Sequence, residues 1–508
     1  MEESNSNPPS RPEQTQTNAF FKMLGKLSGS DMSTQTATEM EDMSNIKVVT
    51  PLSGQQQVVG GFDTCPEYAY TADDDNEMVS SAPSLPMLTD DHGTHVTYLL
   101  GRTYHPINHY NERRDFESSM FWFTYRCDFP EIKPYGITSD AGWGCMIRSA
   151  QMMLAYTLRL HYKSRDWRPP YLLYRRRQDP FMRSMLTWFA DYPSATENVY
   201  SLHNMVAAGQ AYDKLPGEWY GPGSACYVIR DLVELHEKQQ QNGRMHRMPL
   251  RNFRVHVAQQ GAVYRDTIRH LMTRENKARL DEATAQKHRA NPQAHPLDLD
   301  WEEELIESVG EVEWDTALLL LVPLRLGLKS FNKDYLKAVA HTFSFPQSVG
   351  ILGGRERGAR WYYGASSDGT KVFGLDPHTV QSAPRRRLAK VNGVQSTVVD
   401  MTDDYMRSCH TTHPEASSLL RTDPSIAMGF YCRTQEDLED LVVRLQDWKD
   451  NNPSSPELFT VADASPDYAA NVSSAVNDMM GSSLMDDHDI SASAHEESAN
   501  EEDDYVLL

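Results

Sequence analysis

Both ends of the chain are acidic and poor in apolar residues, which limits where a folded core can form. The first 100 residues carry 15 acidic and 4 basic side chains, and residues 450–508 carry 14 acidic and no basic ones. The total charge of −22 therefore leaves residues 101–449 with a net charge of +3. Segments this polar bury too little apolar surface to offset the entropy of ordering. We predict disordered arms at 1–93 and 463–508 around one folded domain at 94–462.

The composition argues against an exported, membrane-spanning or nucleic-acid-binding protein. The best apolar run, Ala317 to Val322, has the length of a strand and is far too short to cross a bilayer. The N-terminus has no basic segment followed by an apolar one, as a signal peptide would. Six cysteines are too few for a disulfide framework and indicate thiols in a reducing compartment. No basic domain is present, so we expect a cytoplasmic protein that does not bind nucleic acid.

The hydrophobic pattern of the central region predicts helices followed by a block of strands. Apolar residues recur at helical spacing from Met146 to Tyr162, and a second helix is expected to start near Pro222. A third is expected from Gln435 to about Lys449, capped by Thr434. The expected strands are 317–322, 350–352, 361–364, 371–375 and 427–432. Polar stretches at about 236–248 and 276–312 are interpreted as surface insertions. This order favours an α+β fold.

Cys145 is a candidate nucleophile because it lies at the start of the first strong helix, after Gly142-Trp143-Gly144. The unpaired N–H groups and the positive dipole end of a helix N-terminus favour a thiolate over a thiol. The two glycines allow a tight turn and close approach of a substrate backbone. A small, inert, buried residue is the alternative interpretation, and position alone does not decide between them.

Asp376-Pro377-His378 follows the strand expected at 371–375. In an extended chain residues i and i+2 point to the same side, and the proline between them stiffens the pair. An imidazole oriented by a carboxylate is what a thiol nucleophile needs as its base. The chain has 18 histidines, however, so the same three residues are also compatible with an ordinary turn.

Five other segments of the chain contribute to the same sequence pattern as these two motifs. They are Trp122–Arg126, Glu218–Pro222, Val322–Gly327, Pro346–Gly354 and Asp423–Cys432. Together with Gly142–Met152 and Asp376–His378, they resemble the autophagin family, the autophagy-related cysteine proteases. The resemblance covers most of residues 98–462 and leaves out the tails and the insertions.

The resemblance implies a papain-like cysteine protease fold with a small accessory subdomain, and it implies roles for particular residues. Cys145 would be the nucleophile, His378 the base and Asp376 the partner that orients it. Tyr125 would help to stabilise the oxyanion, with the backbone N–H of Cys145 as the natural second donor.

The resemblance also implies a cleft that admits a narrow, glycine-ended tail. Trp219 would lie beside this cleft, although a tryptophan packed against the second helix is the other interpretation. Gly353 and Gly354 would border the cleft, with residues 355–360 as its mobile cover. Glycines suit a hinge of this kind, but they equally suit an ordinary hairpin.

Two departures from the family pattern limit what is carried over. Some members have a second cysteine one helical turn after the nucleophile, where this chain has Ser149. The family's His-Cys pair is reversed here, as Cys409-His410, with His413 nearby in a longer loop. This cluster lacks paired-cysteine spacing, so we expect no zinc site, no other metal site and no cofactor.

Members of the family remove residues after a C-terminal glycine of a ubiquitin-like autophagy modifier. They also cleave the amide that joins this glycine to phosphatidylethanolamine, and both reactions are acyl transfers through a thioester. We therefore expect a monomer that acts on the precursor and the lipid-conjugated modifier and contacts autophagic membranes transiently. Arg385–Arg387 could meet anionic headgroups, although a solvated loop is an alternative.

The C-terminus, Glu501 to Leu508, resembles the short motif that docks on these modifiers. Tyr505 and Leu508 are two alternating anchors behind four acids, and such a segment can add a strand to a partner's sheet. A plain acidic tail is the alternative.

Two other functions are compatible with the same residues. A deubiquitinase-like or papain-like hydrolase is the first, although papain-like enzymes usually place His before Asn, and here Asp precedes His. The second is a catalytically weak scaffold that binds the modifier and keeps only the protease fold.

Overall fold

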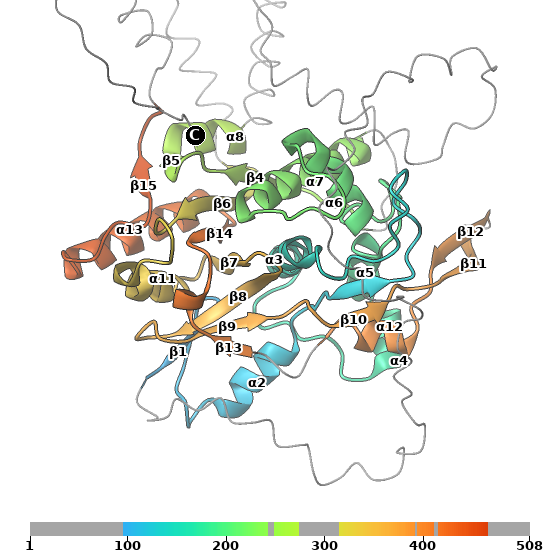
Figure 1. Cartoon of the computed structure of the whole chain (residues 1–508), viewed down its shortest axis with the longest axis horizontal. Coiled ribbons are helices and arrows are strands. Elements are labelled where there is room, and N and C mark those ends of the chain that lie inside the picture. Colours follow the sequence, from blue (N-terminus) through green and yellow to red (C-terminus); the bar gives the residue numbers. More distant parts are fainter. Residues whose placement is uncertain (1–94, 242–247, 274–313, 392–393, 411–414, 466–508) are drawn as a thin grey trace, which may run out of the picture. The chain divides into compact units, whose positions relative to one another are not determined.

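A central β-sheet lies between two layers of helices in the computed structural model (Figure 1). The structure describes residues 95–241, 248–273, 314–391, 394–410 and 415–465. The described residues up to Ala462 belong to one compact unit, and the last three described residues, 463–465, belong to a second. The N-terminal arm at 1–93, the insertion at 276–312 and the docking motif at 501–508 lie outside the described residues.

Nine of the described strands form the main sheet, in the order β13-β9-β8-β7-β14-β6-β4, with β1 on β8 and β2 on β1. Neighbouring strands are antiparallel except for β4 and β6, which are parallel. The strands are β1 (Thr97–Leu99), β2 (Arg102–Tyr104), β4 (Phe253–Val257), β6 (Ala317–Arg325), β7 (Ser348–Arg355), β8 (Gly358–Ser366), β9 (Val372–Leu375), β13 (Glu415–Ser417) and β14 (Ser425–Cys432).

Three two-stranded pairs complete the described strands. They are β3 (Tyr125–Cys127) with β10 (Val380–Ser382), β5 (Ala262–Tyr264) with β15 (Thr460–Ala462), and β11 (Arg386–Val391) with β12 (Val394–Val399). The β11–β12 hairpin extends away from the main sheet beside α12 (Asp403–Arg407), as Figure 1 shows.

The helices cover both faces of the sheet. They are α2 (Tyr110–Ser118), α3 (Cys145–Tyr162), α4 (Leu173–Gln178), α5 (Pro180–Trp188), α6 (Leu202–Gly209), α7 (Pro222–Gln241), α8 (Arg265–Met272), α11 (Leu336–Thr342) and α13 (Gln435–Asn451), besides α12. Short 3₁₀ turns lie at Gln210–Tyr212, Lys333–Tyr335 and Leu419–Arg421. Helices α3 and α7 pack on one face, and α11 and α13 pack on the other.

Strand β6 shows why the sheet is apolar on both faces. Leu319 and Leu321 belong to the core shared with α3, whereas Leu318, Leu320 and Val322 belong to the core on the opposite face. Because successive side chains of a strand alternate between faces, a strand covered on both sides must be continuously apolar. The run from Ala317 to Val322 is therefore a central strand, as its composition indicated.

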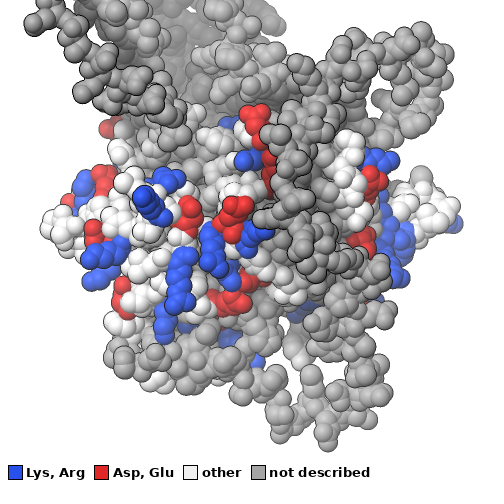
Figure 2. Space-filling model, in the orientation of Figure 1, with Lys and Arg blue, Asp and Glu red and all other residues white. Residues whose placement is uncertain are grey.

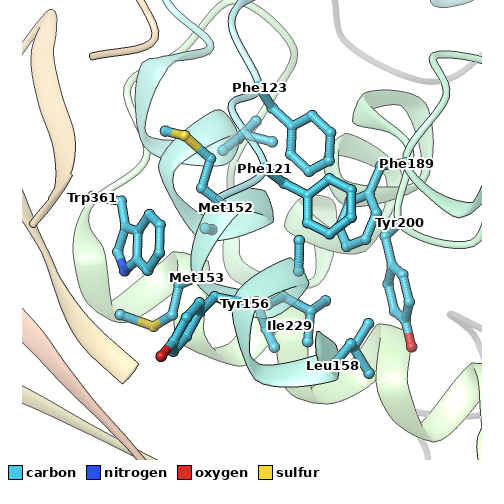
Figure 3. Packing of buried hydrophobic residues seen from close by; sticks show 14 of the residues in the cluster. Phe121, Phe123, Met152, Met153, Tyr156, Leu158, Phe189, Tyr200, Ile229 and Trp361 are labelled. Atoms are coloured by element: carbon cyan, nitrogen blue, oxygen red, sulfur yellow. The ribbon is translucent and has the colours of Figure 1, made fainter. Parts of the chain in front are cut away.

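Helix α3 is the centre of the larger core. Tyr156 of this helix packs on Trp361 of β8 with ring centroids 5.7 Å apart, and Met152 and Met153 point toward the same side of the helix in Figure 3. Sixteen of the 18 residues of α3 are buried, so the helix is fixed on all sides. Gly429 in β14 has no side chain and so leaves room for Met153, because a Cβ at position 429 would lie 3.0 Å from the Met153 sulfur.

The structure confirms the predicted α+β, papain-like fold and most of the expected elements. The first of the predicted helices begins at Cys145, and the last begins after Thr434, whose side chain accepts a hydrogen bond from the Asp437 N–H. The prediction of a surface insertion at about 236–248 is wrong for its first residues, because α7 continues to Gln241. His236 is buried there and shares a 2.9 Å hydrogen bond with the Tyr200 hydroxyl, so polar side chains face the core in this turn.

Candidate active site

Cys145 is the first residue of α3, and its side chain is completely buried. The preceding turn has Gly142 at φ +87°, a conformation that side chains rarely adopt. Gly144 has an ordinary φ of −78°, but a Cβ at this position would clash with the carboxylate of Asp140. The two glycines are thus required for different reasons, one by its backbone conformation and the other by close packing.

Asp140 joins this turn to strand β3 and to helix α3. Its Oδ1 accepts the backbone N–H of Arg126 at 2.6 Å, and its Oδ2 accepts Nε of Arg148 at 2.7 Å. Arg148 also donates to Asp191 at 2.9 Å, and all three charged side chains are buried. Burial raises the pKa of Asp140, and the Arg148 guanidinium opposes this effect. The sequence analysis did not identify this ion triad.

Asp376 and His378 follow the end of β9 and contact each other directly. One carboxylate oxygen of Asp376, Oδ1, accepts the backbone N–H of His378 at 2.8 Å and also bonds the imidazole Nδ1. Burial alone lowers the pKa of His378, but Asp376 and, to a smaller extent, Cys145 outweigh it and raise the pKa to about 9. Burial raises the pKa of Asp376, but its bonds to His378, with a smaller effect of Arg360, lower it to about 2. The pair is therefore an ionised carboxylate beside a cationic imidazole at neutral pH.

The structure brings Cys145, His378 and Tyr125 together. The Tyr125 and His378 rings are perpendicular, with centroids 5.4 Å apart. Burial and then the nearby Cys145 raise the pKa of Tyr125, so its hydroxyl stays protonated. Both Tyr125 and His378 are within hydrogen-bonding reach of Cys145, which contributes to the shift in pKa of each of them. Two polar groups thus lie beside one thiol.

Backbone contacts keep the two halves of this site in register. The Tyr125 N–H donates to the Pro377 carbonyl at 2.9 Å, and Val380 of β10 pairs with Tyr125 of β3. The Trp122 indole donates to the Asp376 carbonyl at 2.7 Å. Strand β3 therefore lies between the thiol-bearing helix and the segment that carries the imidazole.

Arg360 was not identified from the sequence as a residue that contacts the Asp376 carboxylate. Its guanidinium bonds Asp376 Oδ2 and also Glu415 Oε2, the latter at 3.0 Å. Residues 355–360 were expected to be a mobile cover, but Gly358–Arg360 belong to β8, and the connection from β7 is a two-residue turn. The hairpin alternative is therefore the observed one, because Arg355 pairs directly with Gly358.

Gly353 and Gly354 lie in β7, where packing accounts for both. A Cβ on Gly353 would meet Ile426 at 3.2 Å, and one on Gly354, at φ +125°, would clash with the backbone of Ala359 or Gly358. Trp219 is half-buried and packs against the larger core. The place of these three residues beside a substrate cleft stays a prediction.

Ser149 and the Cys409-His410 pair have structural partners. The buried Ser149 hydroxyl donates to the Cys145 carbonyl at 2.9 Å. The Cys409 sulfur lies 3.8 Å from Arg126, and His410 Nδ1 bonds the Met120 carbonyl at 2.9 Å. Among the described residues, no three His, Cys, Asp or Glu side chains are grouped as metal ligands would be. His413 lies outside those residues.

Two of the three arginines at 385–387 are engaged within the protein. Arg386 lies over the Tyr192 ring at 4.1 Å, and Arg387 pairs with Asp400 at 3.1 Å. On the face shown in Figure 2, basic and acidic side chains are interspersed over the described surface. In the described part of the chain, no helix is both long and apolar enough to cross a membrane.

A buried thiol at a helix start, an imidazole and a carboxylate define the site, and with the mixed sheet they mark a papain-like cysteine peptidase. The peptidase C54 catalytic domain matches residues 110–444. The cysteine protease ATG4B of Xenopus laevis is 30% identical over 375 residues, covering 74% of this chain and 85% of the relative. ATG4B of Gallus gallus is 33% identical over 344 residues, covering 68% and 78% respectively. ATG4A of Oryza sativa subsp. indica is 32% identical over 354 residues, covering 68% and 63%.

The chain belongs to the peptidase C54 family, and it is a cysteine-type peptidase. The resemblance to the autophagins, seen in the sequence motifs, is thereby confirmed. The matched region contains every residue of the candidate site described above.

The electrostatics of the site predict how His378 titrates. In the native protein its imidazole should lose its proton near pH 9 instead of 6.5, because Asp376 and Cys145 favour the cation. We expect Asp376→Ala to bring the pKa close to the ordinary value and Cys145→Ala to lower it less, since Asp376 has the larger effect. NMR of the imidazole Cε1–H, assigned with His378→Gln, measures both changes.

The same shift has a consequence for stability. Because the folded pKa lies above the unfolded one, the contribution of His378 is complete below about pH 6.5 and is lost as pH rises through 9. Chemical denaturation should show a decrease in the free energy of unfolding over this window that Asp376→Ala reduces. Equal slopes in the two proteins would contradict the coupling.

Proposed function

We propose that the chain cleaves after the C-terminal glycine of a ubiquitin-like autophagy modifier, through a thioester on Cys145. The observation that carries this proposal is the buried thiol of Cys145 beside His378 and Tyr125, in a chain of the peptidase C54 family. The ATG4 names of its relatives support a role in autophagy. A monomer in the cytoplasm, in transient contact with autophagic membranes, is part of the same proposal.

Before the acylation step, the thiol proton has already passed to His378, whose imidazole is cationic at neutral pH, and the sulfur attacks the carbonyl carbon of the terminal glycine. The tetrahedral oxyanion accepts hydrogen bonds from the Tyr125 hydroxyl and from the Cys145 backbone N–H. His378 then donates its proton to the leaving amine as the C–N bond breaks, which leaves the glycine as a thioester. Asp376 sets the tautomer and orientation of the imidazole throughout.

Deacylation reverses the use of the same groups. Water attacks the thioester carbon while His378 removes its proton, and the sulfur leaves as a thiolate when the C–S bond breaks, which restores its ion pair with the protonated imidazole. The leaving amine of the first step is either a peptide nitrogen or the amine of phosphatidylethanolamine. One site can therefore mature the precursor and release the modifier from lipid, because only the leaving group differs.

The remaining residues would select the substrate. Trp219, Gly353 and Gly354 are proposed to border the channel for the glycine-ended tail. Glycine has no side chain, so a channel narrow enough to exclude larger residues can still admit it.

Cys145→Ser is the direct test of this function. Purified wild-type protein should convert a modifier precursor to a shortened product through a thioester that acid quenching traps. The variant should do neither and should still bind the precursor, since the two side chains have nearly the same size. Cleavage by the variant would assign the nucleophile elsewhere. Cleavage of ubiquitin precursors but not of autophagy modifiers would favour the deubiquitinase alternative.

Tyr125→Phe separates oxyanion stabilisation from substrate binding. A donor directed at the developing oxyanion acts mainly in the transition state, and its loss typically lowers kcat by about 10²–10³-fold. We expect a loss of this order with little change in KM, measured by steady-state kinetics on the precursor. A change confined to KM would instead place Tyr125 in substrate binding.

Tyr505 and Leu508 are proposed to dock on the modifier outside the cleft. If a flexible linker joins this contact to the catalytic domain, docking raises the effective concentration of substrate without changing the chemistry. Replacing both residues with Ala should raise KM on the full-length modifier, leave kcat unchanged and leave cleavage of a short glycine-ended peptide unaffected. Calorimetry with a 495–508 peptide measures the contact itself, and absence of binding would identify a plain acidic tail.

A further inference from the structure

The two oxygens of the Asp376 carboxylate face different partners. Oδ1 accepts the backbone N–H and the imidazole Nδ1 of His378, whereas Oδ2 accepts the Arg360 guanidinium. Arg360 in turn bonds Glu415 Oε2 at 3.0 Å. The carboxylate that orients the imidazole is thus itself oriented by a cation.

We propose that Arg360 is a positioning residue for the hydrolysis: it fixes the rotation of the Asp376 carboxylate, and Glu415 holds Arg360 in place. The inference rests on the catalytic roles proposed above for Asp376 and His378. The terminal torsion of an aspartate side chain is broad, so a carboxylate bonded at one oxygen only keeps more rotational freedom than one bonded at both. A bond at each oxygen restricts that rotation and keeps Oδ1 directed at the imidazole.

The sheet places the three charged residues in one row. Strands β13, β9 and β8 are adjacent, with Glu415 opposite Gly374 and Trp361 opposite Leu375. Arg360 precedes Trp361 on β8, and Asp376 directly follows Leu375 on β9. Arg360 and Glu415 therefore approach the end of β9 from its two neighbouring strands. Arg360 and Glu415 lie on strands and Asp376 directly follows one, so the register of the sheet brings the three residues together.

The backbone of Asp376 is held independently of its side chain. The Trp122 indole donates to the Asp376 carbonyl at 2.7 Å, from a different part of the chain. The main remaining freedom is therefore that of the side chain, which is what Arg360 restricts. Arg360 is a suitable partner because its guanidinium is always charged and presents several donors in a fixed plane.

The charges around this row determine what a substitution would do. Asp376 faces the His378 imidazole and the Arg360 guanidinium, and Arg360 faces Glu415 and the buried Tyr362. Without the guanidinium, Asp376 would accept a proton more readily, because a cation that favours the carboxylate is removed. The same change would leave Glu415 near a carboxylate with no cation between them.

Arg360→Gln and Arg360→Lys test the proposal in the full chain. The first removes the charge and the second retains it, so Lys should recover part of what Gln loses. The quantities to measure are kcat and KM on the modifier precursor and the rate at which iodoacetamide alkylates Cys145. The rate measured with Cys145→Ser is subtracted, because it reports the alkylation of the other cysteines. Alkylation reports on the thiol and imidazole without requiring any protein substrate.

For Arg360→Gln we expect kcat and the alkylation rate to fall by about tenfold, as the loss of a charge-assisted hydrogen bond suggests. KM should stay within about twofold, because Arg360 is not proposed to touch the substrate. The acid limb of the pH profile of alkylation should move to higher pH, since Asp376 is more easily protonated. Glu415→Gln should show the same changes at a smaller size.

Arg444→Gln is the matched control. Arg444 bonds Asp440 at 2.7 Å on α13, so the same exchange removes an arginine–carboxylate pair away from the site. It should leave both rates and the pH profile unchanged.

Wild-type rates and an unshifted acid limb in Arg360→Gln would overturn the proposal. A lower thermal stability of Arg360→Gln would also overturn it if kcat, normalised to the amount of Cys145 that can be alkylated, stayed at the wild-type value. A third outcome is that the alkylation rates follow the expected order, with wild type fastest, Arg360→Lys intermediate and Arg360→Gln slowest, while no precursor is cleaved. That result would support the positioning role and reject the proposed substrate.

Discussion

The arrangement of the site depends on one buried carboxylate, that of Asp140. It bonds the backbone of Arg126, next to Tyr125 on β3, and the side chain of Arg148 on α3, while its own carbonyl accepts the Gly144 N–H at 2.9 Å. Strand, turn and helix are thus joined at a single residue. Breaking a buried ion pair by removing one partner leaves the other charge uncompensated, at a cost of about 3–5 kcal/mol. The spacing between the thiol and the tyrosine hydroxyl is therefore set by an interaction that cannot be loosened cheaply.

Much of this architecture could be predicted from the sequence because the signals are local. Helix α3 follows from apolar residues at helical spacing, and the N-cap of α13 follows from Thr434 before Asp437. The apolar run of β6 predicts a central strand, since both faces of that strand are covered. Cys145 and the Asp376–His378 pair are recognisable for a similar reason. Each lies within a short segment whose chemistry is visible without knowing what packs against it.

The contacts that hold these segments together could not be predicted, because they join residues far apart in the chain. Trp122 and Asp376 are separated by 254 positions, and Arg148 and Asp191 by 43. No spacing rule links such pairs, and an isolated arginine such as Arg360 looks like any solvated side chain. The extent of α7 was missed for a related reason. His236 is polar, but it is buried against Tyr200, and only the tertiary partner makes that position favourable.

The two halves of the site differ in how they are held, and this difference bears on their chemistry. The thiol lies on a helix that is buried along nearly its whole length, so its position is set by apolar packing. The imidazole lies just beyond the end of β9, and its orientation is set by charges: Asp376 beside it, then Arg360, then Glu415. In the proposed mechanism, packing fixes the position of the attacking sulfur, and the charges favour the cationic form of the imidazole that transfers the proton. A helix end and a strand end that meet at β3 provide both, because each kind of element supplies the support that its residue requires.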